Sequence, residues 1–226
     1  MTTFLLLPGA GGEAVYWAPV VELLQRAGHE AIAVDLPADD PGAGLSAYAD
    51  LAVAAVEGRT DVVLAAQSMG AFTAPLVAAR IPVRGLVFVN AMIPVPGESA
   101  SAWGEAVGSE PARLAAAQTG GYPADFDLVA TFLHDVPAEV LDPSEVVNGR
   151  DEAEIAFAEP CLFTAWPDVP ITVLAGRDDR LFPAEFQVRV ARERLGLEAD
   201  VLPGGHLLAL ANPRGVTDHL IAVADG

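Results

Sequence analysis

Short apolar runs alternate with longer stretches of helical periodicity over the first ninety residues. The apolar runs cover 4–7, 31–35, 62–66 and 85–90, and the helical patterns between them cover 20–27, 48–56 and 71–80. Strands that alternate with helices of this length form βαβ units, in which the strands are parallel. The pattern therefore predicts an α/β fold with a mostly parallel sheet that is flanked by helices.

The alternation stops after residue 93 and resumes at residue 169. Pro94, Pro96 and Gly97 interrupt it, and a long alanine-rich, acidic stretch follows. A structureless loop of this length is unusual in a compact domain, whereas an insertion on the ligand side of a sheet commonly covers a site. We therefore expect a helical cap at 94–168, with helices near 112–118, 126–133 and 152–163, between core segments 1–93 and 169–226.

Two more strands and two more helices follow the predicted cap. The strands cover 171–175 and 199–202, and the helices cover 184–195 and 214–224. The sheet is thus expected to have about six strands, and 226 residues suffice for one such domain. Ligands bind beyond the carboxyl ends of strands in open parallel sheets, so functional residues are expected in the loops that follow the strands.

The charge of the chain argues against two classes of partner. The chain has thirty-one acidic residues and twelve basic ones, all arginine, which gives a net charge of -19. Such a surface disfavours binding to nucleic acid or to an anionic membrane. The first apolar run, 4–7, is too short for a signal peptide or a membrane span, so a cytoplasmic location is expected.

The single cysteine, Cys161, allows no internal disulfide and supplies no set of metal ligands. It is expected to be a small buried apolar residue. No metal or cofactor is expected, and the expected partner is a small-molecule substrate. It does not specify an oligomeric state.

Ser68 lies at the corner between the apolar run 62–66 and the helix predicted at 71–80. The corner reads Ala66-Gln67-Ser68-Met69-Gly70, a G-x-S-x-G motif whose first glycine is replaced. A serine at such a corner is raised above the carboxyl end of the sheet, beside the backbone N–H of the next residue. The alternative is an ordinary turn in which the serine side chain caps the helix.

A serine hydroxyl is a weak nucleophile unless a base lies within hydrogen-bond distance. Of the four histidines, His29 precedes a strand, His134 lies in the cap and His219 lies in the last helix. Only His206 follows a strand on a glycine loop at the ligand side. His206 is therefore the expected base for Ser68.

A carboxylate should orient that histidine, and Asp178 and Asp179 both follow the strand 171–175. The order serine, aspartate, histidine is that of the α/β-hydrolase arrangement. Adjacent side chains in an extended loop point in different directions, so only one of the two can face His206. Position alone leaves the choice between them open.

The loop Pro8-Gly9-Ala10-Gly11-Gly12 follows the first strand. Its glycines allow backbone N–H groups to turn toward an oxyanion, and we expect the amides of Ala10 and Met69 to be the donors. The loop could otherwise bind phosphate. It lacks the G-x-G-x-x-G spacing and a following lysine-serine pair, which argues against a nucleotide site.

Apart from the cap, the chain resembles the α/β-hydrolase superfamily. Within this superfamily it resembles the small esterase branch that contains plant methylesterases and hydroxynitrile lyases. The resemblance rests on 7–12 with Trp17, on 28–36, on Gln67-Ser68-Met69-Gly70, on Gly176-Arg177-Asp178-Asp179 with Pro183, and on Gly204-Gly205-His206. It implies an α/β-hydrolase fold in which Ser68 is the nucleophile and His206 the base. It also selects Asp179 as the acid, three residues after Gly176 and four before Pro183.

Two positions depart from the family pattern. Pro8 replaces the histidine that usually precedes the oxyanion glycine, and Ala66 replaces the first glycine of the serine motif. Neither change removes a reacting group. The expected activity is cofactor-independent hydrolysis of a carboxylic ester of a small, largely apolar substrate through an acyl-enzyme. Six apolar side chains are expected to line its pocket, namely Trp17, Phe72, Met92, Trp103, Phe163 and Trp166, although each could equally pack in the core.

Several other functions compete with this one. A lyase acting on cyanohydrins, as the resemblance implies, uses a lysine beside the histidine, but Leu207 stands there and the chain has no lysine. Haloalkane dehalogenases and epoxide hydrolases need an aspartate in place of Ser68. A metal site at His134 and Asp135 lacks a third ligand. A ligand-binding protein on the same fold remains an alternative.

Overall fold

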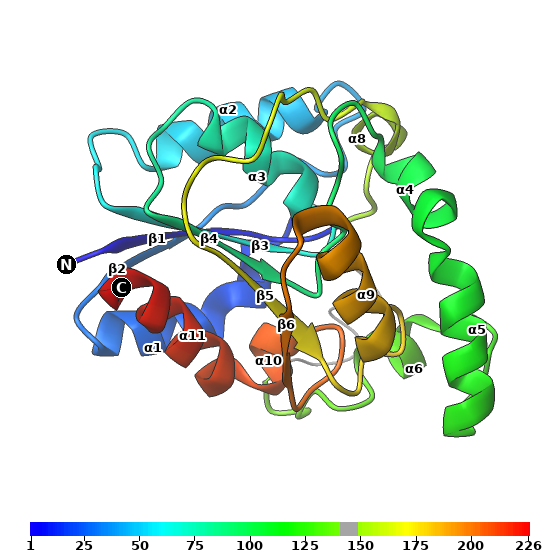
Figure 1. The fold of residues 1–226 in the computed structure, drawn as a ribbon. Coiled ribbons are helices and arrows are strands. Elements are labelled where there is room, and N and C mark those ends of the chain that lie inside the picture. The colour runs from blue at the N-terminus through cyan, green and yellow to red at the C-terminus, as the bar shows by residue number, and fades with distance from the viewer. Residues whose placement is uncertain (141–148) are drawn as a thin grey trace.

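The computed structural model describes residues 1–140 and 149–226 and contains a six-stranded sheet (Figure 1). The strands are β1 (Thr3–Leu7), β2 (Glu30–Ala33), β3 (Val62–Gln67), β4 (Gly85–Val89), β5 (Ile171–Gly176) and β6 (Ala199–Leu202). They lie in the order β2-β1-β3-β4-β5-β6, and every neighbouring pair is parallel. The predicted parallel sheet of about six strands is confirmed.

Helices cover both faces of the sheet (Figure 1). One face carries α1 (Ala18–Arg26) and α11 (Pro213–Asp225), and the other carries α2 (Leu45–Ala55), α3 (Gly70–Ala78) and α9 (Ala184–Leu195). In β1, Phe4 and Leu6 belong to one apolar cluster and Leu5 and Leu7 to the other. Because side chains alternate between the faces of a strand, burial on both faces requires an uninterrupted apolar run.

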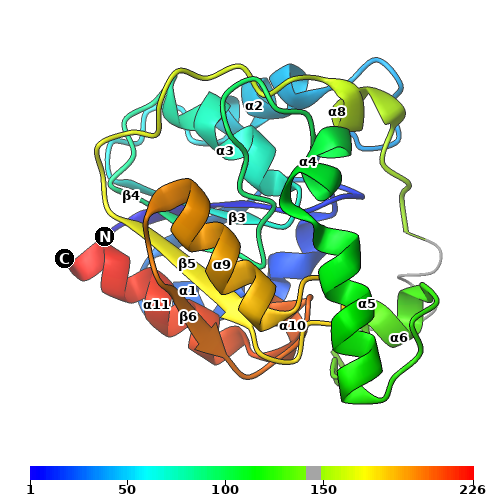
Figure 2. The same ribbon diagram turned by 45° about the vertical axis from the view of Figure 1, so that its right-hand side comes forward.

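The described part of 94–168 contains helices α4 (Ala100–Val107), α5 (Ser109–Gly120), α6 (Leu128–Phe132) and α8 (Glu154–Ala158). Residues 141–148 of the expected cap lie outside the described residues. Figure 2 shows α4 and α5 running along the side of the molecule next to α9. Trp103 of α4 packs on Phe182 and Phe186, with ring centroids 5.2 and 5.8 Å away. Helix α4, which the sequence pattern did not predict, thus shares the main core.

Two predicted helix boundaries in this region differ from the structure. Helix α5 is longer than expected, and α8 ends at Ala158 rather than at residue 163. Glu159 adopts an extended conformation before Pro160, where a proline disfavours helical geometry in the preceding residue. Glu152 lies outside α8 because the helix begins only at Glu154.

Within the described ranges, no helix has the length and apolar character that crossing a membrane requires. Two short helices, η1 (Ala14–Trp17) and α10 (Leu208–Ala211), complete the described secondary structure. They follow the loops after β1 and β6, respectively. Since all strands are parallel, these loops and those after β3, β4 and β5 lie at one edge of the sheet.

Candidate active site

Ser68 lies in a tight turn between β3 and α3. Its φ of +49° is in the left-handed region, which is unfavourable for a residue other than glycine. Gly70 makes the turn possible, because a Cβ at this position would lie 2.3 Å from the carbonyl oxygen of Pro8. Helix α3 begins after Met69 and receives no side-chain cap. The alternative that Ser68 caps the helix is therefore wrong.

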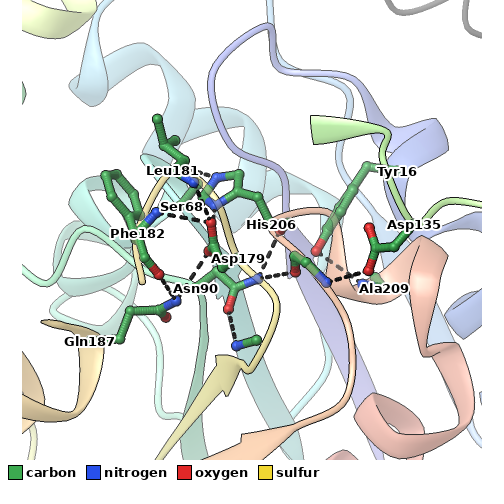
Figure 3. Close-up of polar contacts among 12 residues, drawn as sticks. Tyr16, Ser68, Asn90, Asp135, Asp179, Leu181, Phe182, Gln187, His206 and Ala209 are labelled. Atoms are coloured by element: carbon green, nitrogen blue, oxygen red, sulfur yellow. Dashed lines mark hydrogen bonds and ion pairs between the residues drawn. The ribbon is translucent and has the colours of Figure 1, made fainter. Parts of the chain in front are cut away.

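A chain of hydrogen bonds joins Ser68, His206 and Asp179 (Figure 3). His206 Nε2 lies 3.1 Å from Ser68 Oγ, and His206 Nδ1 lies 2.8 Å from Asp179 Oδ2. His206 and Asp179 are 2% and 3% exposed. Because a carboxylate only accepts, Nδ1 carries the proton and Nε2 is free to accept one from the serine hydroxyl.

The two neighbouring aspartates lie in different surroundings. Asp179 Oδ1 accepts hydrogen bonds from the amides of Leu181 at 2.8 Å and Phe182 at 2.9 Å, and Oδ2 accepts one from Gln187 Nε2 at 3.1 Å. These donors orient the carboxylate toward His206. Asp178 instead pairs with Arg177 at 2.9 Å, and this hydrogen-bonded guanidinium lowers the pKa of Asp178.

The loop after β1 lies directly against Ser68. A Cβ on Gly9 would be 2.9 Å from Ser68 Cβ and 2.3 Å from Gln67 Oε1, so this approach requires glycine. Ala10 is exposed on this loop, and Met69 begins the turn into α3. Among the described residues, neither amide has a hydrogen-bond acceptor, which leaves both available to a ligand beside Ser68.

Ser68 and His206 open into a cavity of about 540 Å³, a size typical of small-molecule sites. Its walls are mostly apolar and come mainly from the loop after β1, η1, α6 and α10. They include Ala10, Val15, Tyr16, Leu128, Phe132, Leu207 and Leu210, together with Val140, which follows α6 in the chain. Glu13 and Arg150 are the charged residues among the described lining. Burial raises the pKa of the Tyr16 phenol, and its oxygen accepts a hydrogen bond from the Ala209 amide at 3.2 Å.

The predicted pocket lining is wrong. Trp17, Phe72 and Trp103 are at most 1% exposed and lie in the core. Met92, Phe163 and Trp166 are partly buried and pack against the core. None of these six residues lines the cavity. Their side chains pack in or against the core instead. Tyr16 and Phe132, which the sequence pattern did not single out, are the aromatic residues in the lining.

The other histidines do not reach Ser68. His29 packs edge-on against Phe4 at 5.3 Å, and His219 contacts the carbonyl of Gly215 at 2.8 Å. His134 and Asp135 contact the loop that carries His206, where Asp135 Oδ2 accepts a hydrogen bond from the Gly205 amide at 2.5 Å. In the two described ranges, no three histidine, cysteine or acidic side chains form a group that could hold a metal ion.

Asn90 is a structural residue of the site that the sequence reasoning missed. It follows β4, is fully buried and has a φ of +46°. Its Nδ2 donates to the carbonyls of Gly205 at 2.9 Å and His206 at 2.8 Å, and its Oδ1 accepts from the Gly176 amide at 2.6 Å (Figure 3). A polar residue at the end of the buried strand 85–90 was the available signal.

We expect Asn90→Ala to lower both stability and esterase activity. The substitution leaves two carbonyls and one amide without their partner, and each buried group left unsatisfied costs about 1–3 kcal/mol. It also removes the two hydrogen bonds that restrain the backbone of Gly205 and His206. Urea denaturation and kcat toward p-nitrophenyl acetate measure the two effects. Asn212→Ala is the control, since Asn212 caps α11 and contacts Pro203 but not His206. Equal losses of kcat in the two folded variants would contradict this role.

Comparison with solved structures finds the same fold in several hydrolases. A pyrethroid hydrolase from Sphingobium faniae JZ-2 is 20% identical, with 100% of this chain and 98% of that chain covered and a TM-score of 0.80. Polyneuridine aldehyde esterase is 19% identical, with both chains fully covered and a TM-score of 0.77. The methylesterase MES16 from Arabidopsis is 16% identical, with 100% and 99% covered and a TM-score of 0.76. At these identities the likeness shows a shared fold.

A search of curated proteins found no match to the chain. A family model did match: the model of the alpha/beta hydrolase family aligns with residues 4–219, which is nearly the whole chain. The alignment spans the serine turn, the aspartate loop and the histidine loop described above. The chain belongs to the alpha/beta hydrolase family.

Proposed function

We propose that this protein is a serine hydrolase that cleaves a carboxylic ester of a small, largely apolar substrate through an acyl-enzyme. The observation that carries the proposal is the hydrogen-bonded chain from Ser68 through His206 to Asp179 at the floor of a cavity. A nucleophile, a base within reach and a group that orients the base are the parts that acyl transfer needs.

In the acylation step, Ser68 Oγ attacks the ester carbonyl while His206 Nε2 takes the hydroxyl proton. Asp179 holds the histidine tautomer and stabilises the imidazolium that forms. The amides of Ala10 and Met69 donate to the oxyanion of the tetrahedral intermediate. The intermediate collapses when the C–O bond to the alcohol breaks, and His206 returns the proton to the departing alcohol.

In the deacylation step, a water molecule enters the place of the alcohol. His206 Nε2 takes a proton from this water as its oxygen attacks the acyl carbon. Collapse of the second tetrahedral intermediate breaks the bond to Ser68 Oγ, which recovers the proton. The products are a carboxylic acid and the free enzyme, so the cycle needs no cofactor.

The shape and chemistry of the cavity support a small, apolar substrate. A volume of about 540 Å³ lies in the range of small-molecule sites. Its apolar lining favours burial of hydrocarbon groups, at about 25 cal/mol for each Å² removed from water. Ester hydrolysis also agrees with the names of two structural neighbours, polyneuridine aldehyde esterase and the methylesterase MES16. The expected cytoplasmic location and the lack of nucleic-acid or membrane partners stay predictions.

The test is a panel of p-nitrophenyl esters from acetate to octanoate, together with a matched thioester and a cyanohydrin. We expect ester hydrolysis with the highest kcat/KM for short acyl chains and no release of aldehyde from the cyanohydrin. Binding of these esters without turnover would contradict the proposal and favour a ligand-binding protein on this fold. Aldehyde release without ester hydrolysis would favour a lyase.

A further inference from the structure

Glu152, in the segment before α8, makes two hydrogen bonds with residues far away in the sequence. Its Oε2 accepts one from the Gly11 amide at 2.9 Å, and its Oε1 accepts one from the Tyr48 hydroxyl at 2.5 Å. Gly11 belongs to the loop that lies against Ser68, and Tyr48 lies in α2 and is 3% exposed. One carboxylate thus joins the segment before α8 to the core and to the predicted oxyanion loop.

The residues next to Glu152 in the chain form hydrogen bonds with the same part of the core. Arg150 donates to the carbonyls of Leu36 at 2.9 Å and Gly12 at 3.3 Å, and it pairs with Asp35 at 2.8 Å. The Ala153 amide donates to the carbonyl of Ala38 at 2.7 Å. Residues on both sides of Glu152 in the chain are thus hydrogen-bonded to the core. These bonds fix the position of the Glu152 carboxylate next to the loop 8–12.

Gly11 has no side chain, so rotation about its backbone dihedral angles is little restricted. Its φ is +87°, in a region that glycine adopts freely. It lies two residues after Gly9 and directly before Gly12. A loop with three glycines can present its N–H groups in many directions, whereas an oxyanion donor must be oriented before the charge develops. The Gly12 amide donates to the carbonyl of Gly9 at 3.1 Å and closes the turn, and the bond to Glu152 adds a second restraint, because it fixes the plane of the Ala10–Gly11 peptide group. The Ala10 N–H lies in the preceding peptide group, which is joined to this fixed plane through the Ala10 Cα.

We propose that Glu152 is a positioning residue that, by holding the Gly11 amide, orients the Ala10 amide toward the oxyanion. The inference rests on the proposed hydrolase function. Glu152 does not touch the reacting atoms; it acts through the loop. Its bond to Tyr48 sets the direction of the carboxylate, so Tyr48 contributes through Glu152.

The expected signature is a loss of kcat with little change in KM, because an oxyanion donor acts in the transition state. Loss of a whole donor costs about 100-fold to 1,000-fold in kcat, so loosening one through Glu152→Ala should cost about 10-fold to 100-fold. Glu152→Gln should restore most of kcat, since its amide oxygen can accept from Gly11 while its NH₂ donates to the Tyr48 oxygen. Tyr48→Phe keeps the Gly11 bond and should lose less than Glu152→Ala.

The experiment measures kcat and KM for p-nitrophenyl acetate, and the rate at which a fluorophosphonate labels Ser68, in these variants and the wild type. Glu154→Ala is the matched control, because Glu154 is an exposed carboxylate two residues away, at the start of α8. Should Glu152→Ala fail to fold, Glu152→Asp keeps the charge but shortens the reach by one methylene. It is expected to lose kcat in the same way.

Labelling separates failure of this inference from failure of the proposed function. A wild-type protein that hydrolyses no ester and takes no label refutes the proposed function. A wild type that is labelled while folded Glu152→Ala keeps the same labelling rate and kcat refutes the role of Glu152 alone. A loss in Glu152→Ala that Glu152→Gln does not restore, or that appears in KM only, also overturns it.

Discussion

Ser68→Ala is expected to lower kcat for ester hydrolysis by a factor on the order of 10⁵ to 10⁶. The reason is that, within residues 1–140 and 149–226, no neighbouring group can take over the attack. Tyr16 is the other hydroxyl in the described lining, and its oxygen is engaged by the Ala209 amide. Cys161 is fully buried and its Sγ donates to the carbonyl of Phe72, and burial raises the pKa of this thiol to about 12.

Initial-rate assays with p-nitrophenyl acetate measure this loss of kcat, and circular dichroism shows whether the variant is folded. Some rate above that in water should remain, because the oxyanion donors and the cavity are left in place. Ser46→Ala is the matched control, since Ser46 is an exposed serine on α2. Activity that persists undiminished in Ser68→Ala would refute the nucleophile.

Asp179→Asn should have the second largest effect, a loss of about 10⁴-fold in kcat. Two backbone amides, those of Leu181 and Phe182, donate to Oδ1 and should keep an oxygen at that position. The new NH₂ group then faces His206 Nδ1. A donor there favours the tautomer with the proton on Nε2, and this tautomer cannot accept the proton of Ser68.

Asp178→Asn provides the comparison for this prediction, because it makes the same chemical change one residue away. Asp178 pairs with the exposed Arg177 and does not contact His206, and its Oδ2 accepts a hydrogen bond from the Gly204 amide at 3.2 Å, which the side-chain oxygen of an asparagine can also accept. We expect its kcat to stay within about three-fold of the wild type, as for other exposed ion pairs. A larger loss in Asp178→Asn than in Asp179→Asn would reverse the assignment between the neighbours.

The fold and the central residues of the site could be predicted because both depend on local patterns. Strands such as 62–66 are buried on both faces, so they show as uninterrupted apolar runs. Ser68 and Asp179 each follow such a strand, and His206 follows the partly exposed edge strand β6. A parallel sheet brings the carboxyl ends of its strands to one edge. Their proximity therefore follows from topology.

The pocket walls could not be predicted because they depend on which way each helix faces. Tyr16 and Trp17 are neighbours in η1, yet Tyr16 lines the cavity and Trp17 is fully buried in the core. Composition does not separate two adjacent aromatic residues on one turn. Glu152 was missed for another reason: its partners Gly11 and Tyr48 are 141 and 104 residues away, and no local pattern marks such a contact.

The central claim is that Ser68 is the nucleophile, and covalent labelling tests it most directly. The folded protein is treated with a fluorophosphonate and digested with trypsin, and the modified peptide is identified by mass spectrometry. Ser68 lies in the tryptic peptide 60–80, between Arg59 and Arg80. We predict one phosphonyl group on Ser68, absent in Ser68→Ala and after unfolding. Ester hydrolysis by a protein that carries no label, or a label on another residue, would contradict the account.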